Sequence, residues 1–141
     1  MNLWGFDYSI DVDVETGIVY EKVYGVWKRE TAEQYVKDFE IEVAAIIGKP
    51  WVRVSDLTNW KTATPEAVDI IGKHLAWCKK NNLAWTVNII DNKVTESQLK
   101  KMIAKGGTAS LTTTVMSRSE ADHFLRDKGF LTNTAAPDLR K

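Results

Sequence analysis

The chain has 141 residues, of which 44% are apolar and 27% are charged, and its formal net charge is zero. This length and composition are typical of one compact globular domain. The balance of 19 basic and 19 acidic residues argues against a nucleic-acid partner, because such binding is dominated by neutralisation of phosphates. No run approaches the roughly 18 apolar residues of a membrane span. A single cysteine, Cys78, fits a reducing compartment, so we expect a cytoplasmic protein.

The first elements in chain order form a predicted β-hairpin. Residues 6–14 alternate between apolar and polar side chains, which is typical of a half-buried strand. A turn follows at residues 15–17, where Gly17 can adopt a positive φ. Residues 18–26 are rich in β-branched and aromatic side chains and form the second strand.

Helices and strands then alternate along the chain. We predict helices over 31–48, 65–80, 95–106 and 117–129, and strands over 51–57, 83–90 and 110–116. The helix starts rest on N-cap residues: Thr64 precedes Pro65, while Thr31, Thr95 and Ser117 each stand three residues before Gln or Glu. One domain over 1–130 is expected, followed by a polar tail over 131–141.

The order ββαβαβαβα predicts an α/β fold with a mixed five-stranded sheet entered by the hairpin. The inner strands carry two different sets of side chains. One face is apolar, with Val52, Val54 and Val87, and the other is polar, with a set of four residues: Arg53, Ser55, Thr86 and Asn88. We therefore expect the helices to lie mainly on one face, with the polar face partly open.

The element order and the run Asp56-Leu57-Thr58, which closes the strand before the second helix, resemble the STAS and SpoIIAA-like group. The resemblance implies a β-α superhelix and a regulatory domain of the kind found in anti-sigma-factor antagonists. Those antagonists carry an Asp-Ser-Ser-Gly run, with a phosphorylated serine, at the start of the second helix. This chain has Lys-Thr-Ala-Thr-Pro at 61–65 instead. It is therefore most similar to the uncharacterised SpoIIAA-like branch, whose members lack that run.

The segment after the third strand is the candidate binding site, because ligands collect at the carboxyl ends of strands in α/β folds. Its predicted residues are Arg53, Asp56, Thr58, Asn59, Trp60, Thr62 and Thr64. Trp60 is either an exposed interface anchor or a hydrophobic lid over the sheet. Asp56 either caps the loop or pairs with Arg53. Thr62 and Thr64 are candidate phosphate acceptors at a helix N-terminus.

Catalytic and metal motifs are missing from the sequence. His74 and His123 have no second ligand at metal-binding spacing, and Cys78 lies on the apolar stripe of its helix. We predict structural or surface roles for the two histidines and a buried, inert thiol. No cofactor, metal or catalytic residue is predicted.

Three functions stay open. The first is a non-enzymatic regulatory module whose loop over 56–64 and second helix contact a protein partner. The second is a small-molecule or lipid-binding protein that uses the polar sheet face. The third and weakest is an enzyme. A cavity lined by Arg53 would favour the second function, whereas a flat apolar surface around Trp60 would favour the first. Homodimer formation is a further expectation, based on the neutral charge and abundant aromatic residues.

Overall fold

The computed structural model describes residues 7–132. The hairpin is formed by β1 (Tyr8–Asp13) and β2 (Ile18–Trp27), which pair in antiparallel fashion. The turn between them is closed by the amide of Gly17, which donates to the carbonyl of Asp13 at 2.9 Å. Gly17 has φ +72°, which a glycine adopts without steric cost. The predicted hairpin is confirmed.

Residues 7–132 continue through α1 (Arg29–Glu42), β3 (Trp51–Ala63), α2 (Pro65–Lys80), β4 (Leu83–Ile89), α3 (Lys93–Gly106), a short 3₁₀ turn η1 (Ala109–Leu111), β5 (Thr112–Val115) and α4 (Arg118–Asp127). The described strands form one five-stranded sheet in the order β1-β2-β3-β4-β5. After the antiparallel hairpin, each remaining pair is parallel. The predicted mixed sheet and element order are confirmed.

Two of the predicted helix starts are confirmed at the level of the cap. The hydroxyl of Thr64 accepts from the amide of Ala67 at 3.3 Å, with Pro65 at the first helical position. The hydroxyl of Ser117 accepts from the amide of Glu120 at 3.1 Å. Each cap satisfies one amide that the first helical turn leaves free.

Two other helices start earlier than predicted. Helix α3 is capped by Asn92, whose side chain accepts from the amide of Thr95 at 2.8 Å, so Thr95 lies inside the helix and is buried. The reason is that an asparagine with extended backbone caps as well as a threonine does. Helix α1 begins at Arg29 rather than Thr31, without a side-chain cap.

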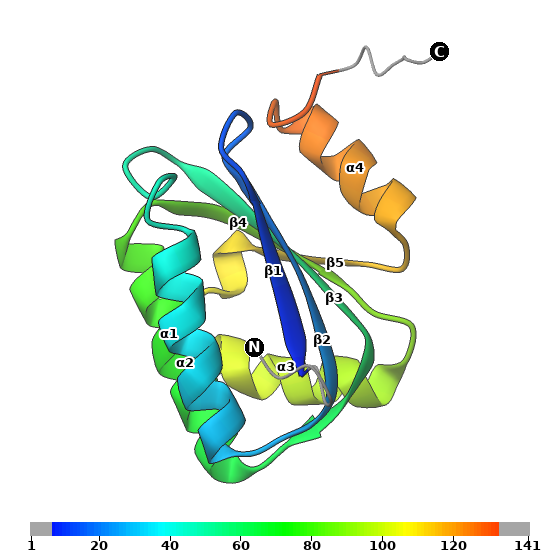
Figure 1. Ribbon diagram of the computed structural model, residues 1–141. Helices are drawn as coiled ribbons and strands as arrows, with labels where there is room; N and C mark the ends of the chain where they lie inside the picture. Colours follow the sequence, from blue (N-terminus) through cyan, green and yellow to red (C-terminus); the bar gives the residue numbers. More distant parts are fainter. Residues whose placement is uncertain (1–6, 133–141) are drawn as a thin grey trace.

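The helices cover both faces of the sheet, but unequally (Figure 1). Helices α1, α2 and α3 share one hydrophobic core with the sheet, in which Phe39, Leu75 and Leu99 represent the three helices. Helix α4 packs on the opposite face through Ala121 and Leu125. The prediction that the helices lie mainly on one face is confirmed.

The sheet face that those three helices cover was wrongly predicted. The polar set of four residues, Arg53, Ser55, Thr86 and Asn88, is buried beneath α1–α3, and is not on an open face. The apolar residues Val52, Val54 and Val87 face α4 instead. A short helix is sufficient to cover the apolar side. The polar side chains can be buried because Arg53 and Ser55 bond to Glu21 and because all four line a cavity.

Helices α2 and α3 approach each other closely where two glycines meet. A Cβ placed on Gly106 would lie 2.6 Å from the Cβ of Leu75 and 2.9 Å from the carbonyl oxygen of Gly72. Both distances are shorter than ordinary van der Waals contact. The missing side chains therefore set how tightly α3 closes against α2, beside the cavity described below.

Part of the sequence interpretation lies outside the described residues. Most of the predicted tail over 131–141 and the first residue of the predicted strand over 6–14 are in this group. Within residues 7–132, Trp27 and Trp51 are both buried and belong to the core that the sheet shares with α1–α3.

Candidate functional site

The segment over 56–63 is strand and not loop, because β3 continues to Ala63 alongside β2. Its register shifts on the way: Lys22 pairs with Asp56, whereas Tyr24 pairs with Asn59, so β3 uses one residue more than β2. Such a bulge reverses the alternation of side chains. As a result Leu57 and Trp60 both point into the core between the sheet and the helices, although they are three positions apart.

Trp60 is therefore only 5% exposed, and the interpretation of an exposed interface anchor is wrong. The bulge is stabilised by Asp56, whose carboxylate accepts from the amide of Thr58 at 3.0 Å and from its hydroxyl at 2.7 Å. Asp56 thus has the capping role that was one of its two predicted roles.

The other predicted site residues do not form one surface. The hydroxyl of Thr62 donates to the side chain of Gln98 on α3 at 2.8 Å, and Thr64 caps α2. Both hydroxyls are therefore engaged within the protein. Asn59 is exposed. Of the seven predicted residues, Arg53 and Trp60 lie together at a cavity.

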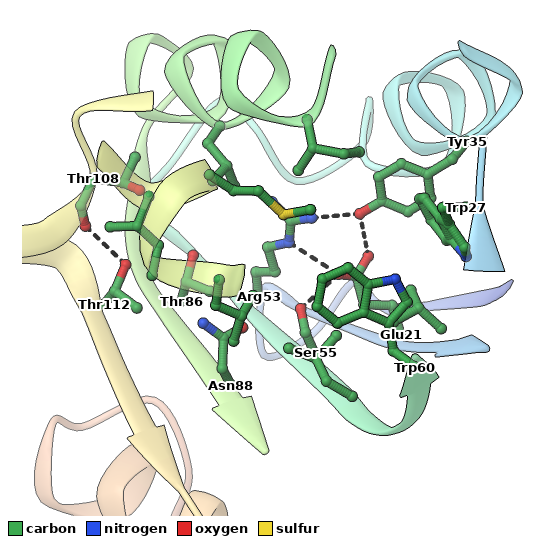
Figure 2. Close-up of a pocket in the computed structure, with 17 residues that line it drawn as sticks. Glu21, Trp27, Tyr35, Arg53, Ser55, Trp60, Thr86, Asn88, Thr108 and Thr112 are labelled. Carbon is green, nitrogen blue, oxygen red and sulfur yellow. Dashed lines mark hydrogen bonds and ion pairs between the residues drawn. The ribbon is translucent and has the colours of Figure 1, made fainter. Parts of the chain in front are cut away.

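That cavity lies between the sheet and helices α2 and α3, and its volume is about 60 Å³ (Figure 2). Its wall is mostly apolar, with Trp27, Leu75, Leu99 and Met102 among its residues. Polar side chains come from the sheet and from the segment that follows α3. They are Glu21, Arg53, Ser55, Thr86, Asn88, Thr108 and Thr112.

One end of the cavity carries a buried ion pair with its own hydrogen-bond network. The Nε of Arg53 lies 3.1 Å from Oε2 of Glu21 on the neighbouring strand. The same oxygen accepts from the hydroxyl of Ser55 at 2.5 Å, and Oε1 accepts from the hydroxyl of Tyr35 at 2.5 Å. Arg53 Nη2 donates to the Tyr35 oxygen, and Nη1 donates to the sulfur of Cys78 at 3.8 Å.

The network keeps Arg53 charged in spite of its burial. Burial opposes the charge, but attraction to Glu21 outweighs that effect and raises the pKa of Arg53 above its ordinary value. Burial also raises the pKa of Tyr35 well above 10, so its hydroxyl stays protonated. All three nitrogens of Arg53 and both carboxylate oxygens of Glu21 have partners inside the protein.

The other end of the cavity offers neutral polar groups. Thr86 is 4% exposed and Thr108 is 1% exposed, and their hydroxyl oxygens have no hydrogen-bond partner within residues 7–132. Figure 2 shows Thr86, Asn88 and Thr108 on one side of Arg53, with Tyr35 and Trp27 on the other. Thr112 is engaged, since its hydroxyl donates to the carbonyl of Thr108 at 2.7 Å. Buried hydroxyls normally have partners, so the two free ones mark this end as a place for a polar group.

His74 and Cys78 lie behind the network, inside the core. Burial and the charge of Arg53 lower the pKa of His74 well below its ordinary value. The ring packs edge-on against Phe39, with centroids 4.6 Å apart. Burial raises the pKa of Cys78 to about 12. The thiol is therefore buried and protonated at neutral pH, as predicted. His123 is exposed on α4.

Sequence reasoning missed Glu21, Tyr35 and Thr108. A signal existed for Glu21, because it stands between Val19 and Val23 on the inward side of its strand. An acidic residue in an apolar series points to a buried partner, and Arg53 on the next strand was the candidate. Tyr35 and Thr108 have no comparable local signal, because only the packing of α1 and the end of α3 brings them to the cavity.

The described part of the chain has neither a metal-binding cluster nor a membrane-spanning helix. Residues 7–132 contain no cluster of three or more histidine, cysteine, aspartate or glutamate side chains arranged to hold a metal ion. No helix in the same range is long and apolar enough to cross a bilayer.

Comparison with solved structures supports the fold. No protein-family model and no curated protein matches the chain. Among solved structures, an uncharacterised DUF3478-family protein from Shewanella loihica PV-4, described as having a SpoIIAA-like fold, superposes with a TM-score of 0.64 at 18% identity. It covers 84% of this chain and 93% of its own. The unphosphorylated anti-sigma factor antagonist SpoIIAA superposes with a TM-score of 0.58 at 9% identity. The superposition covers 86% of this chain and 98% of the SpoIIAA chain. The chain therefore has the SpoIIAA-like fold predicted from its sequence.

Proposed function

We propose that this SpoIIAA-like chain is a non-enzymatic binding protein that holds a small, mostly apolar molecule in the cavity between the sheet and α2–α3. The observation that carries the proposal is the cavity itself, which Arg53 lines. A cavity lined by Arg53 is the feature that favours a small-molecule ligand over a protein partner. An apolar wall with a few polar groups at defined places is the usual composition of a small-molecule site.

The size of the cavity favours a small molecule over a lipid. One water needs about 10–15 Å³ by the same kind of measure, so 60 Å³ corresponds to roughly four to six such positions. An acyl chain of membrane-lipid length exceeds that space.

The chemistry of the surrounding residues supports binding rather than catalysis. Arg53 and Glu21 are paired with each other, and His74 and Cys78 are buried in forms that neither donate nor accept protons readily near pH 7. A general base or nucleophile needs a pKa suited to its task and access to the substrate. We therefore propose that no reaction takes place in this cavity.

A titration with 1-butanol, followed by carbon–proton NMR of the methyl groups, tests the proposal. We expect saturable shifts at the cavity residues Leu75, Leu99 and Ile103, and none at Val54 or Leu125 in the core under α4. Uniform shifts in both cores, or none in either, would contradict the proposal.

A pair of variants on α3 adds a matched control. Leu99→Phe places a larger side chain in the cavity, so it should abolish the saturable shifts at the remaining cavity methyl groups. Val94→Phe lies on the exposed side of the same helix and should leave them unchanged. The wild-type titration stands by itself if Leu99→Phe does not fold.

A second candidate function is the regulatory module that contacts a protein partner. It is supported by the fold shared with an antagonist of anti-sigma factors. It is also supported by a groove of about 570 Å³ beside the start of α2, lined by Thr62, Pro65, Val68 and Lys101 among others. A partner that copurifies with the wild type but not with Val68→Glu would favour this function. Homodimer formation stays a prediction, and light scattering that returns 16.0 kDa at high micromolar concentration would contradict it.

A further inference from the structure

We propose that the occupant of the cavity is an uncharged molecule with one polar end, and that this end is bound by the hydroxyls of Thr86 and Thr108. The inference rests on the proposed function and names the chemical class of the ligand. Three features of the cavity carry it: the charges it contains, the hydrogen bonds already made, and the two hydroxyls that remain.

The charges in the cavity favour an uncharged ligand. Among the described residues that line the cavity, Arg53 and Glu21 are the only charged ones, and Nε of Arg53 lies 3.1 Å from Oε2 of Glu21. Their opposite charges therefore cancel at short range. A carboxylate or ammonium ligand would bring in a third charge without a counter-charge, and an unpaired ion in a buried site is strongly disfavoured.

The hydrogen bonds narrow the position of the polar end. Both oxygens of Glu21 accept from neighbours, and each nitrogen of Arg53 has a partner. Every nitrogen and oxygen of the pair thus makes at least one hydrogen bond within the protein. The ion-pair end of the cavity therefore leaves no polar atom without a partner, in contrast to the two threonine hydroxyls.

Thr86 and Thr108 provide the alternative. Both hydroxyl oxygens are buried and lack partners within the described residues, and both side chains line the cavity. A hydroxyl donates one hydrogen bond and accepts others, so the pair suits an alcohol, a carbonyl or an amide. The apolar part of the ligand would then lie against Leu99 and Met102 on α3.

Three probes of matched length and different charge test the class of ligand: 1-butanol, butyrate and n-butylammonium at pH 7.5. Methyl NMR titrations should give a dissociation constant for butanol at least about tenfold lower than for either ion, because only the ions carry an uncompensated charge into the site. Equal or tighter binding of butyrate or butylammonium would overturn the uncharged class while leaving the proposed function intact. Absence of binding by all three probes would overturn both.

Substitutions of the hydroxyls test the position. Thr86→Val and Thr108→Val keep the shape of each side chain and remove its hydroxyl, so the double variant should bind butanol about tenfold more weakly. Thr113→Val is the matched control, because Thr113 pairs with Val87 and faces the α4 side of the sheet. Unchanged butanol affinity in the double variant would overturn the assignment of the polar end.

Xenon provides a measurement that does not depend on hydrogen bonding. It fills dry apolar cavities, so it should bind the double valine variant as well as it binds the wild type. Loss of both xenon and butanol binding would mean that the substitutions collapse the cavity. In that case Thr86 and Thr108 have a structural role, and the assignment fails.

Discussion

Arg53 and Glu21 form an ion pair across β2 and β3 whose two side chains are almost completely buried, with Nε and Oε2 3.1 Å apart. The pair joins the hairpin to the parallel part of the sheet and holds Tyr35 of α1 against both strands. It therefore links three elements through one polar contact. A buried pair of this kind costs desolvation, so its net stabilisation is small, although loss of one partner is severe.

Glu21→Gln should lower the free energy of unfolding by about 3–5 kcal/mol, because it leaves the charge of Arg53 buried without a counter-charge. Urea unfolding followed by tryptophan fluorescence measures the change. Glu33→Gln is the control: Glu33 pairs with Arg29 on the surface of α1 at 3.3 Å, and its loss should cost less than about 1 kcal/mol. Equal effects of the two variants would contradict the buried role of Glu21.

Stability should depend on pH through His74. Burial and the charge of Arg53 hold the pKa of His74 well below its ordinary value of 6.5. Below about pH 6.5 the unfolded chain binds a proton that the folded chain does not. The free energy of unfolding should therefore fall with decreasing pH, by up to about 1.4 kcal/mol per pH unit.

Urea melts at pH 7 and pH 5 measure this dependence. His74→Gln should reduce it, whereas His123→Gln, which changes an exposed side chain on α4, should leave it as in the wild type. A pH dependence that survives in His74→Gln would show that other groups are responsible.

Gly106→Ala should destabilise the protein by about 1–3 kcal/mol, in spite of the better helix propensity of alanine. The new Cβ would meet the backbone oxygen of Gly72 at 2.9 Å, and backbone cannot move aside as a flexible side chain can. Gly48→Ala is the matched control, because a Cβ there meets nothing within 4 Å. Thermal unfolding compares the two, and equal melting temperatures would refute the close α2–α3 contact.

Trp60→Ala should cost about 3–5 kcal/mol, the range for removing a large aromatic side chain from a core. Trp60 is buried among the residues of the larger core. The neighbouring Asn59 is exposed, so Asn59→Ala should change stability by less than about 0.5 kcal/mol. A denaturant melt in which Trp60→Ala is as stable as the wild type would contradict the burial of Trp60 in the core.

Much of the architecture follows from the sequence alone. Period-two alternation determined the hairpin, and N-cap residues such as Thr64 and Ser117 located two helix starts, since both signals act within a few residues. The grouping of Arg53, Ser55, Thr86 and Asn88 on one sheet face was also correct, because side chains alternate strictly along regular strands.

Tertiary structure decided which face those residues occupy and what they form. A sequence shows that two sets of side chains are on opposite faces of the sheet. Which face the helices cover depends on packing contacts between residues that are distant in the sequence. The bulge in β3 is the second example. It turns Trp60 inward, and its position is set by pairing with β2. The sequence predicted a loop after Leu57 and left the direction of Trp60 open. The cavity arises in the same way, because Glu21, Arg53 and Thr108 meet there only after the sheet and α3 have packed together.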